Sequence, residues 1–419
     1  MRYSSGWQLR CTIVLAMGIL GGNSGARADS VFALNGFGER QIAVDARSAA
    51  LGGAGIALGD GRSLSAINPA TARSEELTFM GLAVAPELLR TSFEDETMTR
   101  VGFDLPLVRA SFRLPIGATL SLGLHGETSF NAPPMQTFVS QVEDADTLDY
   151  FRTLHSDGGI TAASVGLAQD LGRLTLGLRF DYLFGSAQEV WTVDFDTDTL
   201  FFDSSGRVIA IRDQVDFIDT QLSGAQVSIG ACFRPLSALT LGAYATVVPE
   251  ASGEEVLEGV TSGARVINPR TYNLPSRFGA GLAWRPSSRL LWVSDFEMTP
   301  WSNFRVDGKA DPALRDVYRF AGGAEWFLGG ADSVFETHFP IRVGYSESPQ
   351  PYRLGAGDGP WQDISERRFT LGTGLPLAEN RGWLDVSFQL ITRSGAGIDE
   401  QDLMLGVSVT AFERWARKL

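Results

Sequence analysis

The sequence predicts an all-β fold: an antiparallel transmembrane β-barrel of about 14 strands, with an N-terminal segment that plugs its lumen. Three observations support this prediction. The chain begins with an export signal, no later stretch is apolar over the length of a spanning helix, and stretches of alternating apolar and polar residues recur. The composition of the 419 residues, with 47 glycines and 10% aromatic residues, suits this class of protein.

Residues 1–28 have the organisation of a secretory signal peptide. Arg2 and Arg10 supply positive charge, residues 11–22 form a short apolar core, and the segment ends in Ala-Arg-Ala, which predicts cleavage after Ala28. The alternative, a membrane anchor, is disfavoured because the apolar run is shorter than the roughly 20 residues that a spanning helix needs. We therefore expect an exported protein located in the outer membrane of a Gram-negative-type cell.

The charge and cysteine content exclude some functions. The chain has 35 basic and 49 acidic residues, a net charge of −14, and loss of the three arginines of the signal peptide makes it −17. A chain this acidic, without a basic stripe, is not expected to bind nucleic acid. Cys232 is the only cysteine outside the signal peptide, so no intramolecular disulfide is expected.

Alternation of apolar and polar residues marks the strands. The pattern is clearest over 118–127, 173–184, 239–248, 383–392 and 402–412, each about as long as the roughly 9–11 residues of a tilted membrane-crossing strand. Weaker candidates cover 76–85, 105–114, 160–169, 188–196, 220–233, 276–284, 289–298, 318–328, 339–347 and 367–375. Because single-chain barrels have an even number of strands, about 14 is the preferred count, with 12 and 16 as its neighbours.

A soluble β-sandwich also alternates, so the content of the polar face matters. Charged residues stand in mid-strand opposite apolar ones, as in a wet lumen: Arg179, Asp181, Asp295, Glu297, Glu325 and Asp385. Tryptophans near strand ends suit the interfacial girdles of a membrane barrel: Trp284, Trp301, Trp326, Trp383 and Trp415. Both observations favour the barrel.

The connections predict which end of the barrel faces which side. Short turns, expected on the periplasmic side, lie at 171–173, 234–238 and 285–289. Long polar stretches, expected to be extracellular loops, lie at 129–159, 197–219, 250–274, 299–316 and 348–366. We expect one barrel domain over 76–419, preceded by a segment over 29–75.

Residues 48–70 are too rich in glycine and alanine to build a core. Small residues at Gly52, Gly53, Gly55 and Gly59 would let this segment pack in a crowded lumen. Pro69 would fix the turn that leads into the barrel wall. The segment is therefore predicted to be a plug, with a disordered periplasmic leader as the alternative.

Three stretches resemble the long-chain fatty-acid outer-membrane transporter family (FadL/TodX/OmpP1-like). "ARSAALGGAGIALGDGRSLSAINPA" at 46–70 is similar to the N-terminal hatch of that family, which leads into Asn-Pro-Ala. "LPSRFGAGLAWRPSSRLLWVSDFEMTPWSNF" at 274–304 is similar to its strand pair ending in Trp-Ser-x-Phe, and "FPIRVGYSESPQPY" at 339–352 to a strand followed by a Ser-Pro loop. The resemblance covers most of the chain after the signal peptide.

The resemblance implies a fourteen-stranded barrel whose hatch blocks the lumen. It also implies capture of hydrophobic ligands by extracellular loops, a lumenal pocket, and exit through an opening in the wall at a kinked third strand. That strand corresponds to 117–128, where no bulge can be identified from the sequence. The hatch role carries over to Asn68, Pro69 and Ala70, and also to Gly52, Gly53 and Asp60. The chain departs from the family pattern at its end, "FERWARKL", which is closer to hatch-less or secretion-linked relatives of the same superfamily.

The first long loop offers candidate ligand contacts. Its apolar residues are Phe130, Met135, Phe138, Leu148, Tyr150, Phe151 and Leu154, of which we take Phe130, Phe138 and Phe151 as ligand-binding candidates. Residues 146–154 have roughly helical spacing and could form an amphipathic cap, or the loop could pack on itself. Arg152 and Arg179 are candidate partners for a ligand carboxylate.

Catalysis and metal binding have little support. The histidines His125, His155 and His338 show no metal-binding spacing, and the acidic stretch at 196–207 fits no standard calcium loop, so no metal or cofactor is expected. A barrel enzyme would require His125 within hydrogen-bonding reach of a serine and an acid, such as Ser129 and Glu127, which are near it in sequence.

We therefore expect a non-enzymatic, monomeric channel in contact with outer-membrane lipids. It would take up hydrophobic small molecules, long-chain fatty acids or hydrocarbons, by passive, hatch-gated diffusion. The alternative is a structural or secretion-partner barrel without a transported ligand.

Overall fold

The computed structural model describes residues 30–34, 37–42, 44–72, 78–93, 96–143, 146–195, 201–202, 208–209, 213–259, 263–328, 339–355, 360–378 and 381–413. The predicted signal peptide lies outside these residues. Among them, no helix is long and apolar enough to cross a membrane.

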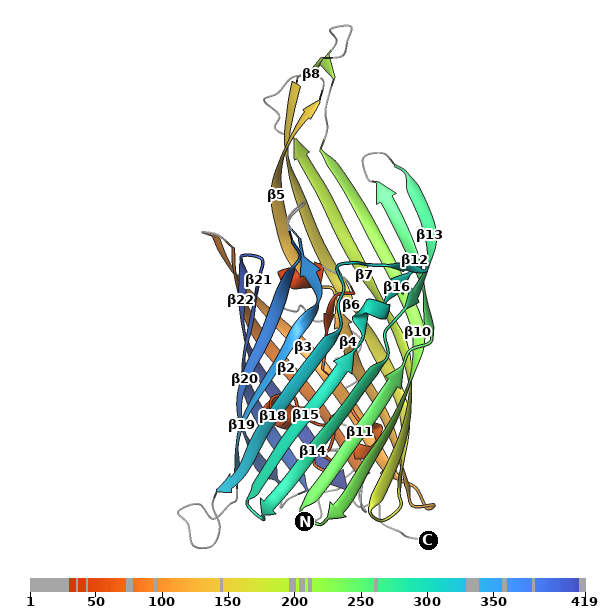
Figure 1. Ribbon diagram of the computed structural model, residues 1–419, viewed down its shortest axis with the longest axis vertical. Coiled ribbons are helices and arrows are strands. Elements are labelled where there is room, and N and C mark those ends of the chain that lie inside the picture. The colour runs from red at the N-terminus through yellow and green to blue at the C-terminus, as the bar shows by residue number, and fades with distance from the viewer. Residues whose placement is uncertain are drawn as a thin grey trace, which may run out of the picture.

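The described strands form a closed antiparallel barrel of 14 strands, as the sequence predicts (Figure 1). The last barrel strand pairs with the first, which closes the wall. The barrel strands are β2 (Thr78–Phe93), β3 (Glu96–Arg113), β4 (Ala118–Ser129), β6 (Asp146–Asp170), β7 (Leu174–Phe195), β10 (Gln214–Leu236), β11 (Leu239–Val247), β14 (Arg277–Ser287), β15 (Leu290–Thr299), β18 (Val317–Leu328), β19 (Phe339–Leu354), β20 (Gln362–Leu377), β21 (Gly382–Gly395) and β22 (Ile398–Glu413).

Alternation places apolar side chains outside and charged ones inside. On β7, Leu178 and Phe180 are 52% and 47% exposed, whereas Arg179 and Asp181 between them are buried. The predicted lumenal residues Asp295, Glu297, Glu325 and Asp385 are likewise buried. A continuous apolar outer surface combined with a charged interior is the arrangement of a transmembrane barrel.

The tryptophans divide between the two surfaces. Trp284 and Trp326 are exposed on the outside of the barrel, where a girdle is expected. Trp383 does not belong to a girdle, because the Arg62 guanidinium lies 3.8 Å from the centroid of its ring inside the barrel. The girdle prediction is also wrong for Trp301, which packs against Phe37 of the N-terminal segment. Trp415 lies outside the described residues.

On one side the wall continues well beyond the rest of the barrel (Figure 1). The extension consists of the far ends of β6, β7 and β10 with β5 (Ala132–Glu143), β12 (Glu250–Gly259) and β13 (Arg265–Asn273). Much of the predicted loops 129–159 and 250–274 is therefore strand, and 188–196 is the end of β7 rather than a separate strand. Residues 146–154 are not a helical cap, since they continue the ladder of β6 with β7, where Tyr150 pairs with Phe195.

Smaller elements complete the fold. Two-residue strands are β8 (Phe201–Phe202), β9 (Val208–Ile209), β16 (Arg305–Val306) and β17 (Lys309–Ala310), and the 3-10 helix η3 spans Trp301–Asn303. The tight turns at 171–173, 234–238 and 285–289 connect strands at the end opposite the extension (Figure 1).

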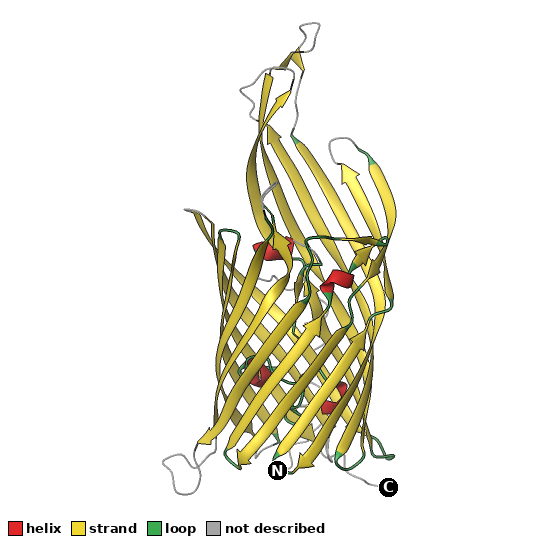
Figure 2. Cartoon of the chain, in the orientation of Figure 1, coloured by secondary structure: helices red, strands yellow, loops and turns green. Residues whose placement is uncertain are grey.

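The N-terminal segment lies inside the barrel rather than outside it (Figure 2). It contains the 3-10 helix η1 (Val31–Leu34), the strand β1 (Glu39–Arg40), the single-turn helix α2 (Ala46–Ala49) and the 3-10 helix η2 (Pro69–Thr71). Helix η1 lies toward the end of the barrel that carries the wall extension, whereas α2 and η2 lie deeper in the lumen (Figures 1 and 2). We call residues 30–72 the hatch.

Candidate ligand pathway

The Asn-Pro-Ala motif fixes the end of the hatch to the wall. The Asn68 side-chain amide donates hydrogen bonds to the Ile56 carbonyl (2.7 Å) and the Ala231 carbonyl (3.3 Å), while its oxygen accepts one from the Ala70 amide (3.0 Å). Pro69 follows at the first position of η2, where its missing N–H costs no hydrogen bond. The predicted hatch residues Asn68, Pro69 and Ala70 are thus brought together in one buried turn.

Two wall glycines make room for this turn. A Cβ atom at Gly230 would lie 2.0 Å from the Asn68 oxygen, and one at Gly177 would lie 2.3 Å from the Ala70 nitrogen. Any side chain at either position would push the turn away from the wall.

Gly52 and Asp60 also serve as contact points. The Gly52 amide donates to the Thr370 hydroxyl (3.1 Å), and the turn continues through Gly53 with a positive φ of 77°. Asp60 accepts two hydrogen bonds from Arg47, each 2.8 Å long. Burial alone would raise the pKa of Asp60, but the positive charges of Arg47 and Arg285 hold this pKa well below its usual range.

Buried charges on several strands hold the lower hatch, residues 45–72. Asp295 on β15 accepts hydrogen bonds from the amides of Gly55 (2.6 Å) and Ile56 (2.9 Å). Arg109 on β3 donates to the carbonyls of Leu64 and Ser65, and Arg319 on β18 donates to the Gly52 carbonyl. Because these contacts come from different sides of the barrel, the lower hatch is fixed to the wall on several sides.

The upper hatch, residues 30–34 and 37–42, is also fixed to the wall, in part by the pairing of β1 with β4 and by a hydrogen bond from the Tyr352 hydroxyl to the Phe32 carbonyl. Glu400 accepts hydrogen bonds from the Ser30 hydroxyl (2.8 Å) and the Val31 amide (2.9 Å). Arg40 pairs with Glu297 at 3.0 Å, and Glu39 pairs with Arg393. The predicted plug is therefore a two-part structure.

An open cavity of about 550 Å³, the vestibule, lies between the upper hatch and the wall extension. Its apolar lining includes Phe37, Phe130, Ile160, Leu222, Tyr272 and Phe304. Charged residues at its edge include Arg270 and Asp307, which pair at 2.8 Å. A hydrogen bond from the Thr271 amide and one from Arg270 hold the pKa of Asp307 below its usual range.

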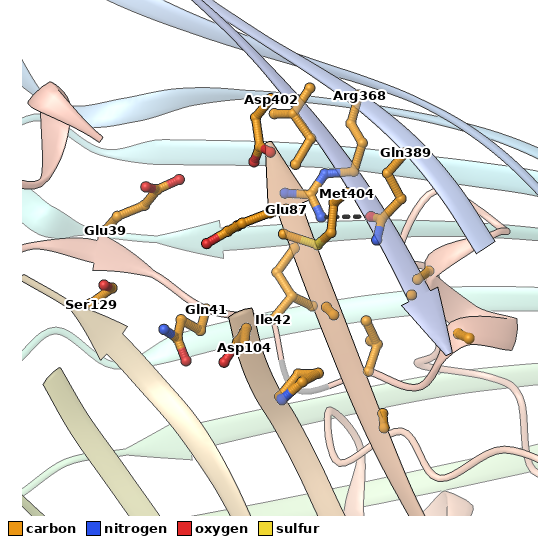
Figure 3. A pocket seen from close by; sticks show the side chains of 18 of the residues that line it. Glu39, Gln41, Ile42, Glu87, Asp104, Ser129, Arg368, Gln389, Asp402 and Met404 are labelled. Carbon is orange, nitrogen blue, oxygen red and sulfur yellow. Dashed lines mark hydrogen bonds between the residues drawn. The ribbon is translucent and has the colours of Figure 1, made fainter. Parts of the chain in front are cut away.

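A smaller inner cavity, of about 100 Å³, lies between the hatch and the wall formed by β2, β3 and β20 to β22 (Figure 3). Ile42, Ala85, Leu89, Ile391 and Met404 provide apolar lining. Polar side chains also reach it, and Asp402, Glu87, Arg368 and Gln389 gather around Met404 (Figure 3). The sequence does not reveal this cavity, because its lining comes from segments more than 300 residues apart.

The wall beside the inner cavity is incomplete. The β3–β4 ladder covers Leu107 to Arg113 on β3 and stops where Leu107 pairs with His125. Beyond this point β3 still pairs with β2 as far as Glu96, while the free edge of β4 pairs with the hatch strand β1. Asp104 and Pro106 from β3 and Ser129 from β4 line the inner cavity at this gap.

Bulges on both strands accompany the gap. The β2–β3 register shifts between the pairs of Ala83 and Ala85, and the β4–β6 register shifts between Gly126 and Thr128. The third barrel strand thus has an irregularity that the sequence did not reveal. Pro106 was the available signal, because proline in a sheet is confined to edges and bulges.

The predicted ligand residues are not brought together in one place. Phe130 lines the vestibule and packs against Phe37, with ring centroids 5.6 Å apart. Phe138 and Phe151 pack against each other on the wall extension, 56% and 43% exposed, and neither lines the vestibule or the inner cavity.

The two candidate arginines are also separated. Arg152 lies over the ring of Trp191, 5.6 Å from its centroid, on the extension. Arg179 is buried in the lower lumen, where it pairs with Asp181 and donates to the Ala66 carbonyl. Its role in the structure is to anchor the lower hatch.

His125 has a serine and an acid nearby, although the serine is not Ser129. Its Nδ1 lies 3.3 Å from the Ser164 hydroxyl and its Nε2 lies 3.7 Å from Glu127, which also pairs with Arg277. The cavity beside Ser164 measures only about 10 Å³, the space of roughly one water molecule. A substrate therefore has no room at this serine.

Within the described part of the chain, no group of three or more histidine, cysteine, aspartate or glutamate residues could hold a metal ion. Most of the acidic stretch at 196–207, and His338, lie outside the described residues.

No protein-family model and no curated protein matches the sequence. Solved structures do match it. The chain is similar to the CymD monoaromatic hydrocarbon channel, with 14% identity, a TM-score of 0.57 and coverage of 88% of this chain and 98% of that one. It is similar to the Pseudomonas putida toluene transporter TodX (15% identity, TM-score 0.56, coverage 92% and 100%). It is also similar to a Pseudomonas aeruginosa FadL homologue (11% identity, TM-score 0.53, coverage 94% and 100%).

These matches span nearly the whole chain, whereas sequence identity is low. They agree with the closed transmembrane barrel described above. The chain therefore has a FadL/TodX-like outer-membrane barrel fold.

Proposed function

We propose that the protein is an outer-membrane channel for passive uptake of hydrophobic small molecules. One observation carries the proposal: a partly apolar cavity beside the hatch adjoins a gap in the barrel wall. A barrel that served only as a scaffold would need neither the cavity nor the gap. The fold is that of structures described as a toluene transporter and hydrocarbon channels, which agrees with this choice.

The proposed path has three steps. A ligand first enters the vestibule, where aromatic side chains such as Phe37 and Phe130 remove its apolar surface from water. It next passes the upper hatch, whose residues line both the vestibule and the inner cavity. It then leaves sideways through the gap between β3 and β4 into the membrane. The lower hatch stays in place and blocks a straight path through the lumen.

Uptake measurements with a blocked cavity test this proposal. Ala85 lines the inner cavity and is buried, so Ala85→Phe fills the cavity next to the gap. Ala411 is exposed on the outer face of β22, and Ala411→Phe adds the same ring outside the lumen. Radiolabelled toluene and oleate would be supplied to cells that lack their own transporters and express each form.

We expect the unaltered protein and Ala411→Phe to raise uptake of at least one probe above that of cells without the protein. Ala85→Phe should lower it to near that background while the barrel remains folded, shown by its heat-modifiable migration on gels. Uptake of both probes at background with the unaltered protein would contradict the proposal. Full uptake by Ala85→Phe would refute the path through the inner cavity.

A further inference from the structure

Several buried polar atoms at the inner cavity have no hydrogen-bond partner among the described residues. They are two acceptors, Oδ1 of Asp402 and Oε1 of Gln41, and two donors, Nε of Arg40 and of Arg368. All four residues line the cavity, and Asp402 is 97% buried, with 3% of its surface exposed. A buried polar atom that lacks a partner is costly, so these atoms would gain from a partner supplied by water or by a ligand.

Other nitrogens of the two arginines are already engaged. The terminal nitrogens of Arg368 donate to Gln389 (3.2 Å) and Glu366 (3.3 Å), and Arg40 donates to Glu297 (3.0 Å). Arg368, with both terminal nitrogens engaged, therefore offers the cavity its Nε–H rather than the two-pronged face that binds a carboxylate.

The charges around the cavity also disfavour an anionic ligand. Five carboxylates but only three arginines line the cavity. The carboxylates are those of Glu39, Asp45, Glu87, Asp104 and Asp402, and the arginines are Arg40, Arg368 and Arg393. Arg393 pairs with Glu39 and with Glu366, which leaves it little attraction for a further carboxylate. A ligand carboxylate would meet a net negative surrounding.

A hydroxyl group can pair with both the unpartnered acceptors and the unpartnered donors of the cavity. It can donate one hydrogen bond to Asp402 or Gln41 and accept another from the Nε of Arg368 or Arg40. A hydrocarbon would leave all four atoms without partners. The apolar side of the cavity, formed by residues such as Ile42, Ala85 and Met404, suits one ring or a few methylene groups.

We propose that the inner cavity selects a small apolar molecule bearing a neutral hydroxyl group, an alcohol or a phenol, over the corresponding hydrocarbon or carboxylate. This selectivity rests on the proposed uptake function, of which it specifies the substrate class.

Binding of three probes with the same ring tests the selectivity. Benzyl alcohol, toluene and benzoate would each be titrated into the full-length protein in lipid nanodiscs, with empty nanodiscs as the blank, and binding followed by saturation-transfer NMR. We expect benzyl alcohol to bind at least about tenfold more tightly than toluene or benzoate, since sites that pair a hydroxyl discriminate strongly against analogues that lack it.

Toluene or benzoate binding as tightly as benzyl alcohol would overturn the selectivity and leave the uptake function standing. Failure of all three probes to bind would count against the uptake function itself.

Two variants locate the effect. Asp402→Leu and Gln41→Leu each remove an acceptor with little change in size, so benzyl alcohol should lose about tenfold in affinity and toluene should bind no worse. Gln188→Leu is the control: it makes the same substitution as Gln41→Leu, but at an exposed position on the outer part of β7. It should change the affinity for neither benzyl alcohol nor toluene. Gln41 belongs to the hatch and is only half-buried, so Gln41→Leu should not disturb folding of the barrel. The test therefore stays valid even if Asp402→Leu fails to fold. Unchanged preference for the alcohol in both folded variants would refute the assignment.

Discussion

Individual charged residues hold the hatch of this barrel in place. Arg47 is the clearest case: its side chain is fully buried and bonds Asp60 on the hatch and Glu325 on the wall at the same time. A buried ion pair contributes little net stability over an apolar core, but removal of one partner leaves the other charge buried and alone. These residues therefore fix where the hatch sits more than they increase the stability of the fold.

Substitution of Arg47 tests this role. Arg47→Met leaves Asp60 and Glu325 with fewer partners, and we expect unfolding in detergent to become easier by about 3–5 kcal/mol. Arg173→Met, at an exposed arginine in the turn after β6, should change the unfolding midpoint little. The measurement is the urea midpoint followed by tryptophan fluorescence. Equal midpoints for the two variants would show that the buried network does not hold the hatch.

The structural elements differ in how far the sequence predicts them. Strands such as β7 are predictable because one face meets lipid and the other the lumen, which enforces a period of two. The extension is not predictable in this way, since the alternation fades there: the neighbouring side chains of Phe151 and Arg152 on β6 are both exposed. The gap beside β3 depends on register shifts, and only Pro106 signals it. The hatch was predictable from its small residues, but not the ion pairs that anchor it.

The packing of the hatch against wall glycines leads to a prediction about these elements. Gly230→Ala would place a Cβ 2.0 Å from the Asn68 oxygen, so the end of the hatch must move. We expect the barrel to stay folded while trypsin cleaves the hatch faster, at a cost of about 1–3 kcal/mol in local stability from the lost hydrogen bonds. Gly59→Ala is the matched control within the hatch, because its Cβ would meet nothing closer than 3.9 Å. Equal cleavage rates in the two variants would contradict the packing described.

At the scale of the whole molecule, the hatch lies inside the barrel (Figure 2), and two cavities, the vestibule and the inner cavity, adjoin it. The inner cavity also adjoins the only long interruption in the ladders between neighbouring barrel strands in the described part of the chain. In the proposed path, this arrangement would let an apolar molecule go from water to the membrane interior without opening an aqueous pore. The order of cavities, rather than any single residue, is what the proposed function depends on.

The most direct test of this account is a crystal structure of the protein soaked with 4-bromotoluene, with the bromine located by its anomalous signal. If the proposed path is right, a bromine peak lies in the inner cavity, among Ile42, Ala85 and Met404 and next to the gap between β3 and β4. The same soak of Ala85→Phe should show no peak there. Bromine found only in the vestibule or on the outer surface of the barrel would contradict the proposed path.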